Sequence, residues 1–373
     1  MKGDRFQPRV LVVPPSYFAR ERTVGGGERY ALEYARALSA FTPTTLALFD
    51  TTASCEQQGS LTVKAFAVRH FNQRRGFPLT RQSWNELKEY DVIHAMVFPT
   101  PLTDLLMLEG RLRGQTLVLT DVGGGGSCWS TYLQKLHPRL SLNRLAHGLA
   151  LLSEHAASFF TEWPHPKKIL FGGVNLETFP ATPVPEGGYA LFIGRLLSHK
   201  GVLPLIECVS ADTPLHIVGR AYDKDYLARL QKAAEGKKVT FVMDADDARL
   251  RAELAGSAVV LQPSLPSDDP GGDKSELLGL VNLEAMASGR PVIVTRTCSL
   301  PELVRNGETG FIVPPGDQTA LREKIELLLK DAGLAGRMGA AARAHIERNF
   351  TWPLVATRGL EFYQELVRAR KRL

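Results

Sequence analysis

The chain has 373 residues, of which 44% are hydrophobic and 23% charged, a composition typical of a globular protein with room for two domains. No apolar run approaches the roughly 20 residues of a membrane-spanning helix, and the first residues lack the apolar core of a signal peptide. The four cysteines have neither the spacing of a metal site nor the density of a disulfide framework. We therefore expect a cytoplasmic protein without a bound metal.

The formal net charge of +6 is not evenly distributed. Residues 1–170 contain 20 Lys and Arg against 14 Asp and Glu, whereas the remaining residues contain 25 of each. A basic first half fits an acidic partner, such as a phosphorylated acceptor or an anionic membrane surface, but so small an excess fits simple solubility as well. Peripheral contact with the inner membrane face stays open, and no nucleic-acid partner is expected.

Short apolar runs and helical periodicities alternate along the chain, which favours parallel sheets covered on both faces by helices. In the first half, strands are predicted at Arg9–Val13, Thr45–Phe49, Leu61–Phe66, Val92–Ala95, Thr116–Thr120, Leu149–Ser153 and Lys168–Phe171. The loop that ends in Gly25-Gly26-Gly27 separates the first strand from a helix predicted over Glu28–Leu38. A strand, a glycine loop and a helix in this order can bind a phosphate at the start of the helix, although three glycines are as typical of a flexible loop.

A second glycine-rich loop, residues 121–127, directly follows the predicted strand Thr116–Thr120. At the carboxyl end of a parallel strand, such a loop faces the ligand crevice of the sheet. Asp121 either holds a donor or acceptor hydroxyl or caps the glycine turn, and the sequence leaves both possibilities open.

Prolines at 180, 183 and 185 indicate a stiff linker, with a domain boundary near residues 172–187. Beyond it, strands are predicted at Tyr189–Ile193, Leu215–Gly219, Val239–Val242, Val259–Gln262 and Pro291–Thr295, and helices at Tyr226–Ala234, Ala248–Leu254, Gln318–Leu329, Leu334–Asn349 and from Leu354 onward.

Two cations follow the strand Tyr189–Ile193. Arg195 leaves the strand end and Lys200 is predicted to begin a helix, so both can converge on one diphosphate. In a surface loop, however, Arg and Lys are often merely solvated.

The stretch Ser275–Gly289 reads as a polar loop that enters a helix at about Leu280. The first amides of that helix, near Leu277 to Val281, suit phosphate or sugar oxygens. Glu276 lies just before the helix and Glu284 about one turn inside it, and carboxylates beside an anion would hold neutral hydroxyls. The alternative is a first-turn acid and a solvated helix residue.

Glu276 and Glu284 are followed by Ala285-Met286-Ala287 and Gly289-Arg290-Pro291-Val292. Together with Gly26-Gly27-Glu28-Arg29, Gly194-Arg195-Leu196 and Lys200-Gly201, these residues resemble the signature of the family 4 glycosyltransferases and their relatives with the GT-B fold. The resemblance implies an α/β protein of two doubly wound, Rossmann-like domains facing across a cleft. It implies an acceptor-side domain over residues 1–175, to which a helix at 354–373 crosses back, and a nucleotide-sugar-binding domain over 186–350.

The implied activity is transfer of a sugar from a nucleotide-diphospho-sugar, most readily UDP- or GDP-linked, to an acceptor hydroxyl with retention of configuration and without metal or other cofactor. The acceptor would be a glycan, a lipid-linked sugar or a small molecule. The residues expected to act in catalysis are Glu276, Arg195, Lys200 and Asp121. Donor binding is expected at Gly26, Gly27, Arg195, Lys200, Gly219, Met243, Glu276, Gly279, Leu280, Val281 and Glu284.

The chain departs from the family pattern at two places. Many relatives have a His where this chain has Val122, which puts a His-based role in doubt, and Thr297-Cys298-Ser299 replaces a small glycine turn, which predicts a different donor selectivity. A non-catalytic nucleotide-sugar-binding subunit and a nucleotide-sugar epimerase of the same fold therefore remain as alternatives. Loops 16–24, 67–83 and 121–140 are expected to select the acceptor, and the acidic loop 268–273 is either a lid or a solvated segment.

Overall fold

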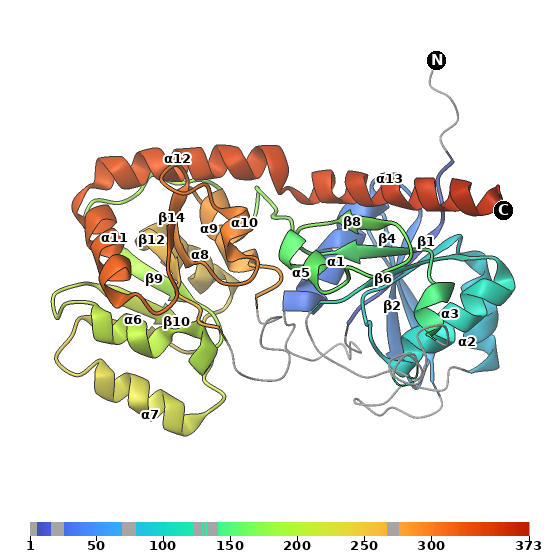
Figure 1. Ribbon diagram of the computed structural model, residues 1–373, viewed down its shortest axis with the longest axis horizontal. Coiled ribbons are helices and arrows are strands. Elements are labelled where there is room, and N and C mark those ends of the chain that lie inside the picture. Colours follow the sequence, from blue (N-terminus) through green and yellow to red (C-terminus); the bar gives the residue numbers. More distant parts are fainter. Residues whose placement is uncertain are drawn as a thin grey trace, which may run out of the picture. The chain divides into compact units, whose positions relative to one another are not determined.

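A computed structural model of the protein describes residues 6–15, 26–68, 80–122, 129, 132, 141–266 and 276–372. Loop 16–24 and the acidic loop 268–273 lie outside the described residues, as does most of 67–83 and 121–140. The chain divides into two compact units (Figure 1). Unit 1 consists of Met1–Gly173 with Trp352–Leu373, and unit 2 of Val174–Thr351.

Within the described residues, unit 1 has an eight-stranded sheet in the order β3-β4-β2-β1-β5-β6-β7-β8. The strands are β1 (Val10–Val13), β2 (Thr44–Asp50), β3 (Ser54–Gln58), β4 (Leu61–Ala67), β5 (Val92–Ala95), β6 (Thr116–Thr120), β7 (Gly148–Leu151) and β8 (Lys167–Ile169). Neighbouring strands run parallel, as predicted, except that β3 pairs antiparallel with β4 through a tight turn at Gly59. β3 was missed because its residues are polar and exposed and carry no apolar alternation.

The helical segments described in unit 1 are α1 (Gly26–Ser39), α2 (Arg81–Glu86), η1 (Leu87–Glu89), α3 (Pro101–Arg113), η3 (Leu142–Leu145), α5 (Glu154–Ser158) and α13 (Trp352–Lys371). α1 begins at Gly26, two residues before the predicted start, so Gly26 and Gly27 belong to the helix. α13, the red helix that runs to the C-terminus in Figure 1, packs on α1 and on β6. The last helix of the chain is therefore part of unit 1.

A buried chain of hydrogen bonds fixes α13 to α1 and to the sheet. The Tyr363 hydroxyl lies 2.6 Å from the Tyr34 hydroxyl and 2.6 Å from Nδ1 of His94, whose Nε2 lies 2.6 Å from Oγ1 of Thr120. Burial lowers the pKa of His94 to about 3, so the imidazole is neutral and one ring nitrogen donates while the other accepts. Gly359 makes room for this contact, because a Cβ there would lie 1.9 Å from the Tyr34 hydroxyl.

Replacing Tyr363 by phenylalanine is expected to lower the free energy of unfolding by about 2–4 kcal/mol, since the buried His94 and Tyr34 each lose a partner. Urea unfolding followed by circular dichroism measures the change. Tyr222→Phe is the matched control, because that tyrosine is 64% exposed. Equal stability of the two variants would contradict the assignment.

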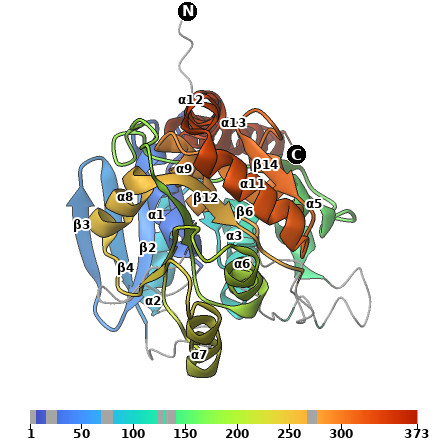
Figure 2. The ribbon, with the colours of Figure 1, turned by 90° about the vertical axis from the view of Figure 1, so that its left-hand side faces the viewer.

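Within the described residues, unit 2 has a six-stranded, fully parallel sheet in the order β11-β10-β9-β12-β13-β14. The strands are β9 (Tyr189–Ile193), β10 (Leu215–Val218), β11 (Val239–Val242), β12 (Ser257–Gln262), β13 (Val292–Thr295) and β14 (Gly310–Val313). The helical segments are η4 (Ser198–Lys200), α6 (Val202–Cys208), α7 (Lys224–Ala233), α8 (Asp247–Gly256), α9 (Leu280–Ala287), α10 (Leu300–Leu303), α11 (Gln318–Lys330) and α12 (Ala332–Asn349). Figure 2 turns this unit toward the viewer.

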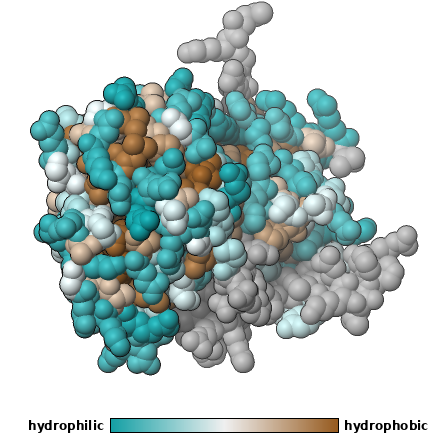
Figure 3. All heavy atoms as spheres, turned by 60° about the vertical axis from the view of Figure 1, so that its left-hand side comes forward, coloured by the Kyte–Doolittle hydropathy of each residue, from teal (hydrophilic) through white to brown (hydrophobic). Residues whose placement is uncertain are grey.

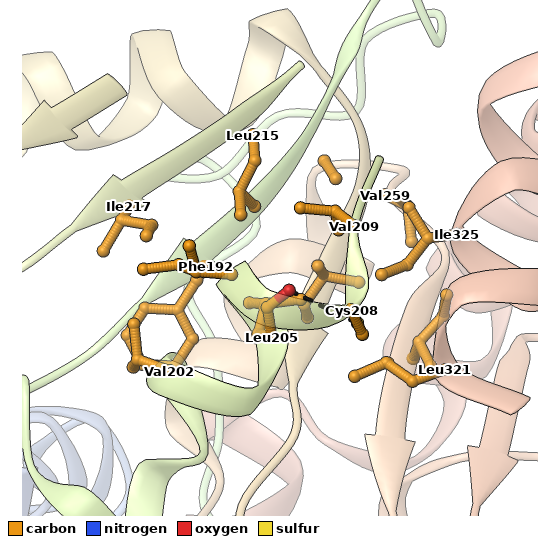
Figure 4. Close-up of a cluster of buried hydrophobic side chains, with 14 of the residues drawn as sticks. Phe192, Val202, Leu205, Cys208, Val209, Leu215, Ile217, Val259, Leu321 and Ile325 are labelled. Carbon is orange, nitrogen blue, oxygen red and sulfur yellow. Dashed lines mark hydrogen bonds between the residues drawn. The ribbon is translucent and has the colours of Figure 1, made fainter. Parts of the chain in front are cut away.

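The core of unit 2 lies between the sheet and helices α6, α7 and α11 (Figure 4). Phe192, Leu215 and Val259 from three strands meet Leu205 of α6 and Ile325 of α11. These are the apolar runs and helical faces from which the elements were predicted. The core holds the strands in register, and so fixes where the loops at their carboxyl ends lie.

On the face drawn in Figure 3, most of the surface is hydrophilic, with hydrophobic residues in separate small groups. Among the described residues, none of the helices is both long enough and apolar enough to cross a bilayer.

Candidate active site

The predicted donor-binding residues of unit 2 lie at the carboxyl edge of its sheet. Arg195 follows β9, Gly219 follows β10 and Met243 follows β11, while Gly279 precedes α9. Because all six strands are parallel, their carboxyl ends meet at one edge, where doubly wound folds bind ligands. Arg195 is exposed at this edge, and Met243 is half-buried against the core.

Two glycines allow the loops at this edge to touch. Gly201 has φ +69°, and a Cβ there would lie 1.9 Å from the carbonyl oxygen of Pro263, which follows β12. A Cβ on Gly219 would lie 1.8 Å from the carbonyl oxygen of Gly194. Any side chain at position 219 would therefore clash with the backbone of Gly194, whether or not Gly219 contacts a ligand. Gly201 also ends η4, so the helix predicted to begin at Lys200 begins instead at Val202.

Lys200 and Glu276, which are 76 residues apart, form an ion pair here. The Lys200 ammonium donates to Oε1 of Glu276, and the Ser264 hydroxyl donates to the same oxygen at 2.7 Å. The two charged side chains are only 12% and 8% exposed. The fold therefore brings together two residues that were predicted from separate motifs, and Ser264, which the sequence reasoning did not single out, joins them.

The segment Thr297-Cys298-Ser299 forms hydrogen bonds with the backbone of Glu276 and of Ser264. The Ser299 amide donates to the backbone carbonyl of Glu276 at 3.1 Å, and the Ser299 hydroxyl donates to the same oxygen. The Thr297 hydroxyl donates to the carbonyl of Ser264 at 3.2 Å. Cys298 between them has φ +49°, a backbone conformation that favours glycine. Thr297 and Ser299, which differ from the family pattern, thus hold the backbone of Ser264 and Glu276 in place.

Helix α9 begins beside Glu276, at Gly279 with φ +57°. No side chain caps this end, and among the described residues the N–H groups of Leu280 and Val281 donate to no acceptor. The positive end of the helix dipole thus lies only three residues after Glu276, the partner of the Lys200 ammonium. Glu284, one turn into α9, is buried and interacts with another group of the chain.

The remaining predicted residues lie in unit 1. A Cβ on Gly27 would lie 3.2 Å from Cγ of Pro15 and 3.3 Å from Cγ2 of Val122, so the first turn of α1 contacts the segments that follow β1 and β6. Asp121 is 2% exposed and interacts with another group of the chain, so its carboxylate is not simply solvated. Among the described residues, no three His, Cys, Asp or Glu side chains gather in a way that could hold a metal ion.

Two α/β units with parallel sheets and a final helix that returns to the first unit define the GT-B class of folds. Solved structures with this fold cover nearly the whole chain. Sucrose-phosphate synthase from Thermosynechococcus elongatus aligns over 97% of this chain and 100% of its own, with a TM-score of 0.70 and 21% identity. HepE of Anabaena, crystallised with UDP and glucose, aligns over 95% of this chain and 99% of its own, with a TM-score of 0.71 and 20% identity.

The family model for glycosyl transferases group 1 matches residues 177–345. This match supports a group 1 glycosyltransferase and agrees with the resemblance of the motifs to that class of enzyme. Alpha-maltose-1-phosphate synthase of Mycobacterium tuberculosis is 27% identical over 272 residues, which are 65% of this chain and 68% of the relative. Phosphatidyl-myo-inositol mannosyltransferase of Mycobacterium leprae is 31% identical over 204 residues, 52% of each chain.

Proposed function

We propose that the protein transfers a sugar from a nucleotide-diphospho-sugar, UDP- or GDP-linked, to the hydroxyl of an acceptor, with retention of configuration and without a metal ion. The observation that carries this proposal is the pair of Lys200 and Glu276 beside the uncapped end of α9. Similarity to a protein crystallised with UDP and glucose supports the choice of donor.

The chemical demand is a departing diphosphate, whose growing negative charge needs fixed cations and dipoles. Lys200, the exposed Arg195 and the free amides of Leu280 and Val281 can provide them at one edge of the sheet. This set can neutralise the leaving group with protein groups alone.

Glu276 has a second task in this proposal. A diphosphate at the start of α9 competes with the carboxylate for the Lys200 ammonium, and the released carboxylate then accepts hydrogen bonds from sugar hydroxyls. Ser264 keeps one carboxylate oxygen in place during the exchange. Without a donor, Lys200 and Glu276 thus neutralise each other. With a donor bound, Lys200 holds the diphosphate and Glu276 holds the sugar.

In the transfer step, the bond from the anomeric carbon to the phosphate oxygen breaks and a bond to the acceptor oxygen forms on the same face of the sugar. The acceptor proton passes to the departing phosphate oxygen. Asp121 in unit 1 is proposed to hold a donor or acceptor hydroxyl, and Glu284 the ribose of the donor. Gly26, Gly27, Gly219, Gly279 and Met243 are proposed to line the donor site through their backbones.

The acceptor is proposed to be a glycan, a lipid-linked sugar or a small molecule. Peripheral contact of the basic first unit with an anionic membrane is part of the same proposal.

The test is to incubate the purified protein with a panel of UDP-, GDP- and ADP-sugars and a broad set of acceptors, with and without EDTA. Release of nucleotide together with a glycosylated acceptor is expected, unchanged by EDTA, and the product's anomeric configuration is read by NMR. Donor binding without turnover would indicate the non-catalytic subunit. An altered sugar without acceptor product would indicate the epimerase.

A further inference from the structure

A group of arginine and histidine side chains lies on unit 1, away from the residues described above. Its members come from α3, η3, the segments before β7 and β8, and α13: Arg111, Arg144, His147, His165 and Arg370. Nη1 of Arg370 lies 2.9 Å from where a Cβ on Gly114 would be, so its guanidinium covers the end of α3. Nε2 of His165 donates to the backbone carbonyl of Arg144 at 3.0 Å.

His147 lies within reach of the charges of this group. Burial, followed by the positive charges of Arg370, His165 and Arg111, lowers its pKa to about 4. Nδ1 of His147 accepts the Leu117 amide at 3.1 Å, so its proton is on Nε2. The imidazole is therefore neutral near pH 7, and the arginines carry the charge of the group.

Among the described residues, Arg111, Arg144 and Arg370 form no ion pair, whereas Arg113 on the same helix pairs with Glu109. Nε of Arg370 is buried without an acceptor. The C-terminal ends of α3 and α13 each offset only about half a charge. Three arginines on neighbouring elements, without an ion-pair partner in the described part of the chain, thus favour an anionic ligand.

An exposed apolar face adjoins the arginines. Leu112, next to Arg111, is 82% exposed, and Leu108, one turn earlier on α3, is 40% exposed. Residues four apart lie on the same face of a helix. Single exposed leucines are ordinary, but exposed leucines beside unpaired arginines are typical of surfaces that meet the headgroup region of a membrane.

This group lies at the opposite edge of the sheet from Asp121. Gly114, His147 and His165 precede β6, β7 and β8, and so lie at the amino ends of these strands, while Asp121 follows β6. A five-residue strand spans about 16 Å. A surface bound at the amino edge therefore leaves the carboxyl edge of unit 1 open.

We propose that this face, formed by Arg111, Leu112, Arg144, His165 and Arg370, binds the anionic surface of a phospholipid membrane. The guanidinium groups donate to lipid phosphates and Leu112 enters the boundary between headgroups and acyl chains. This inference deepens the membrane part of the proposed function and rests on it only there, because vesicle binding needs no sugar transfer.

The test uses sedimentation of the whole chain with vesicles of phosphatidylcholine alone or mixed with phosphatidylglycerol. The wild-type chain is expected to bind only the mixed vesicles, and less as salt rises. The variant R111Q/R144Q/R370Q is expected to bind them on the order of 100-fold more weakly. The matched control R229Q/R251Q/R322Q removes the same charge from exposed positions of unit 2 and is expected to bind like wild type.

Leu112→Ser tests the apolar part without touching a charge, and is expected to weaken vesicle binding about tenfold. Circular dichroism and UDP binding verify the fold of each variant. No binding of wild type to mixed vesicles, or equal losses in both triple variants, overturns the proposal. It also fails if inorganic phosphate displaces the protein from vesicles while Leu112→Ser changes nothing, since the group is then a site for a small phosphorylated ligand.

Discussion

Replacing Glu276 by alanine is expected to lower kcat/KM for the sugar donor by on the order of 100- to 1000-fold. The change removes the carboxylate proposed to hold the sugar and leaves the Lys200 ammonium, which is only 12% exposed, without its partner. Initial rates with the best donor of the panel measure the effect. Glu326→Ala is the matched control, because it removes a carboxylate from a surface ion pair on α11 of the same unit.

Lys200→Ala should show a loss of similar size, and the double variant should lose little more than either single one. Residues that act as a unit are not additive in their effects on kcat/KM. Full addition of the two losses on a logarithmic scale would show that Lys200 and Glu276 act independently. Activity of Glu276→Ala within about threefold of wild type would remove the basis of the proposed site.

Replacing Arg290 by methionine is expected to lower the free energy of unfolding of unit 2 by about 3–5 kcal/mol. Arg290 is fully buried, and its guanidinium donates only to oxygens of neutral groups. The acceptors are the carbonyls of Leu254, Ala255, Thr182, Pro183 and Gly289 and the hydroxyl of Thr182. Methionine has a similar length but no donor, so these oxygens would remain buried without partners.

Urea unfolding measures this loss, with Arg322→Met on the exposed face of α11 as the matched control. Burial lowers the pKa of Arg290 to about 10, which still leaves the guanidinium charged at neutral pH. A change in the protonation of Arg290 therefore does not affect the comparison of the two variants near pH 7. A difference between the two variants below about 1 kcal/mol would show that the carbonyls find water or other partners instead.

The sequence was a good guide to the strands, because those of a doubly wound sheet are continuous apolar runs. It did not predict β14. It also failed at β3, whose side chains face solvent, and at the start of α6, where Gly201 interrupts the helix. In both places the local pattern carries no sign of the partner that decides the conformation. For Gly201 that partner is the carbonyl of Pro263, more than sixty residues away.

At the candidate site, the motifs predicted which residues to examine but not what holds them. Glu276 and Lys200 were found from the spacing of motifs, whereas Ser264 and Ser299 were not. No local sequence pattern distinguishes a serine that forms a hydrogen bond with a glutamate from any other serine. Arg290 was identified only as part of a motif, and its burial depends on the segment at Thr182 and on the end of α8. Contacts between distant segments decide such roles, and no local pattern records them.

The buried Tyr363 also has a practical consequence for anyone who wishes to produce the two halves of the enzyme separately. A fragment comprising residues 1–173 lacks α13, so Tyr34 and His94 would be left without their shared partner and the apolar side of α1 would face water. A stable fragment of unit 1 therefore requires residues 352–373 to be joined to residues 1–173, whereas residues 174–351 form a continuous gene segment.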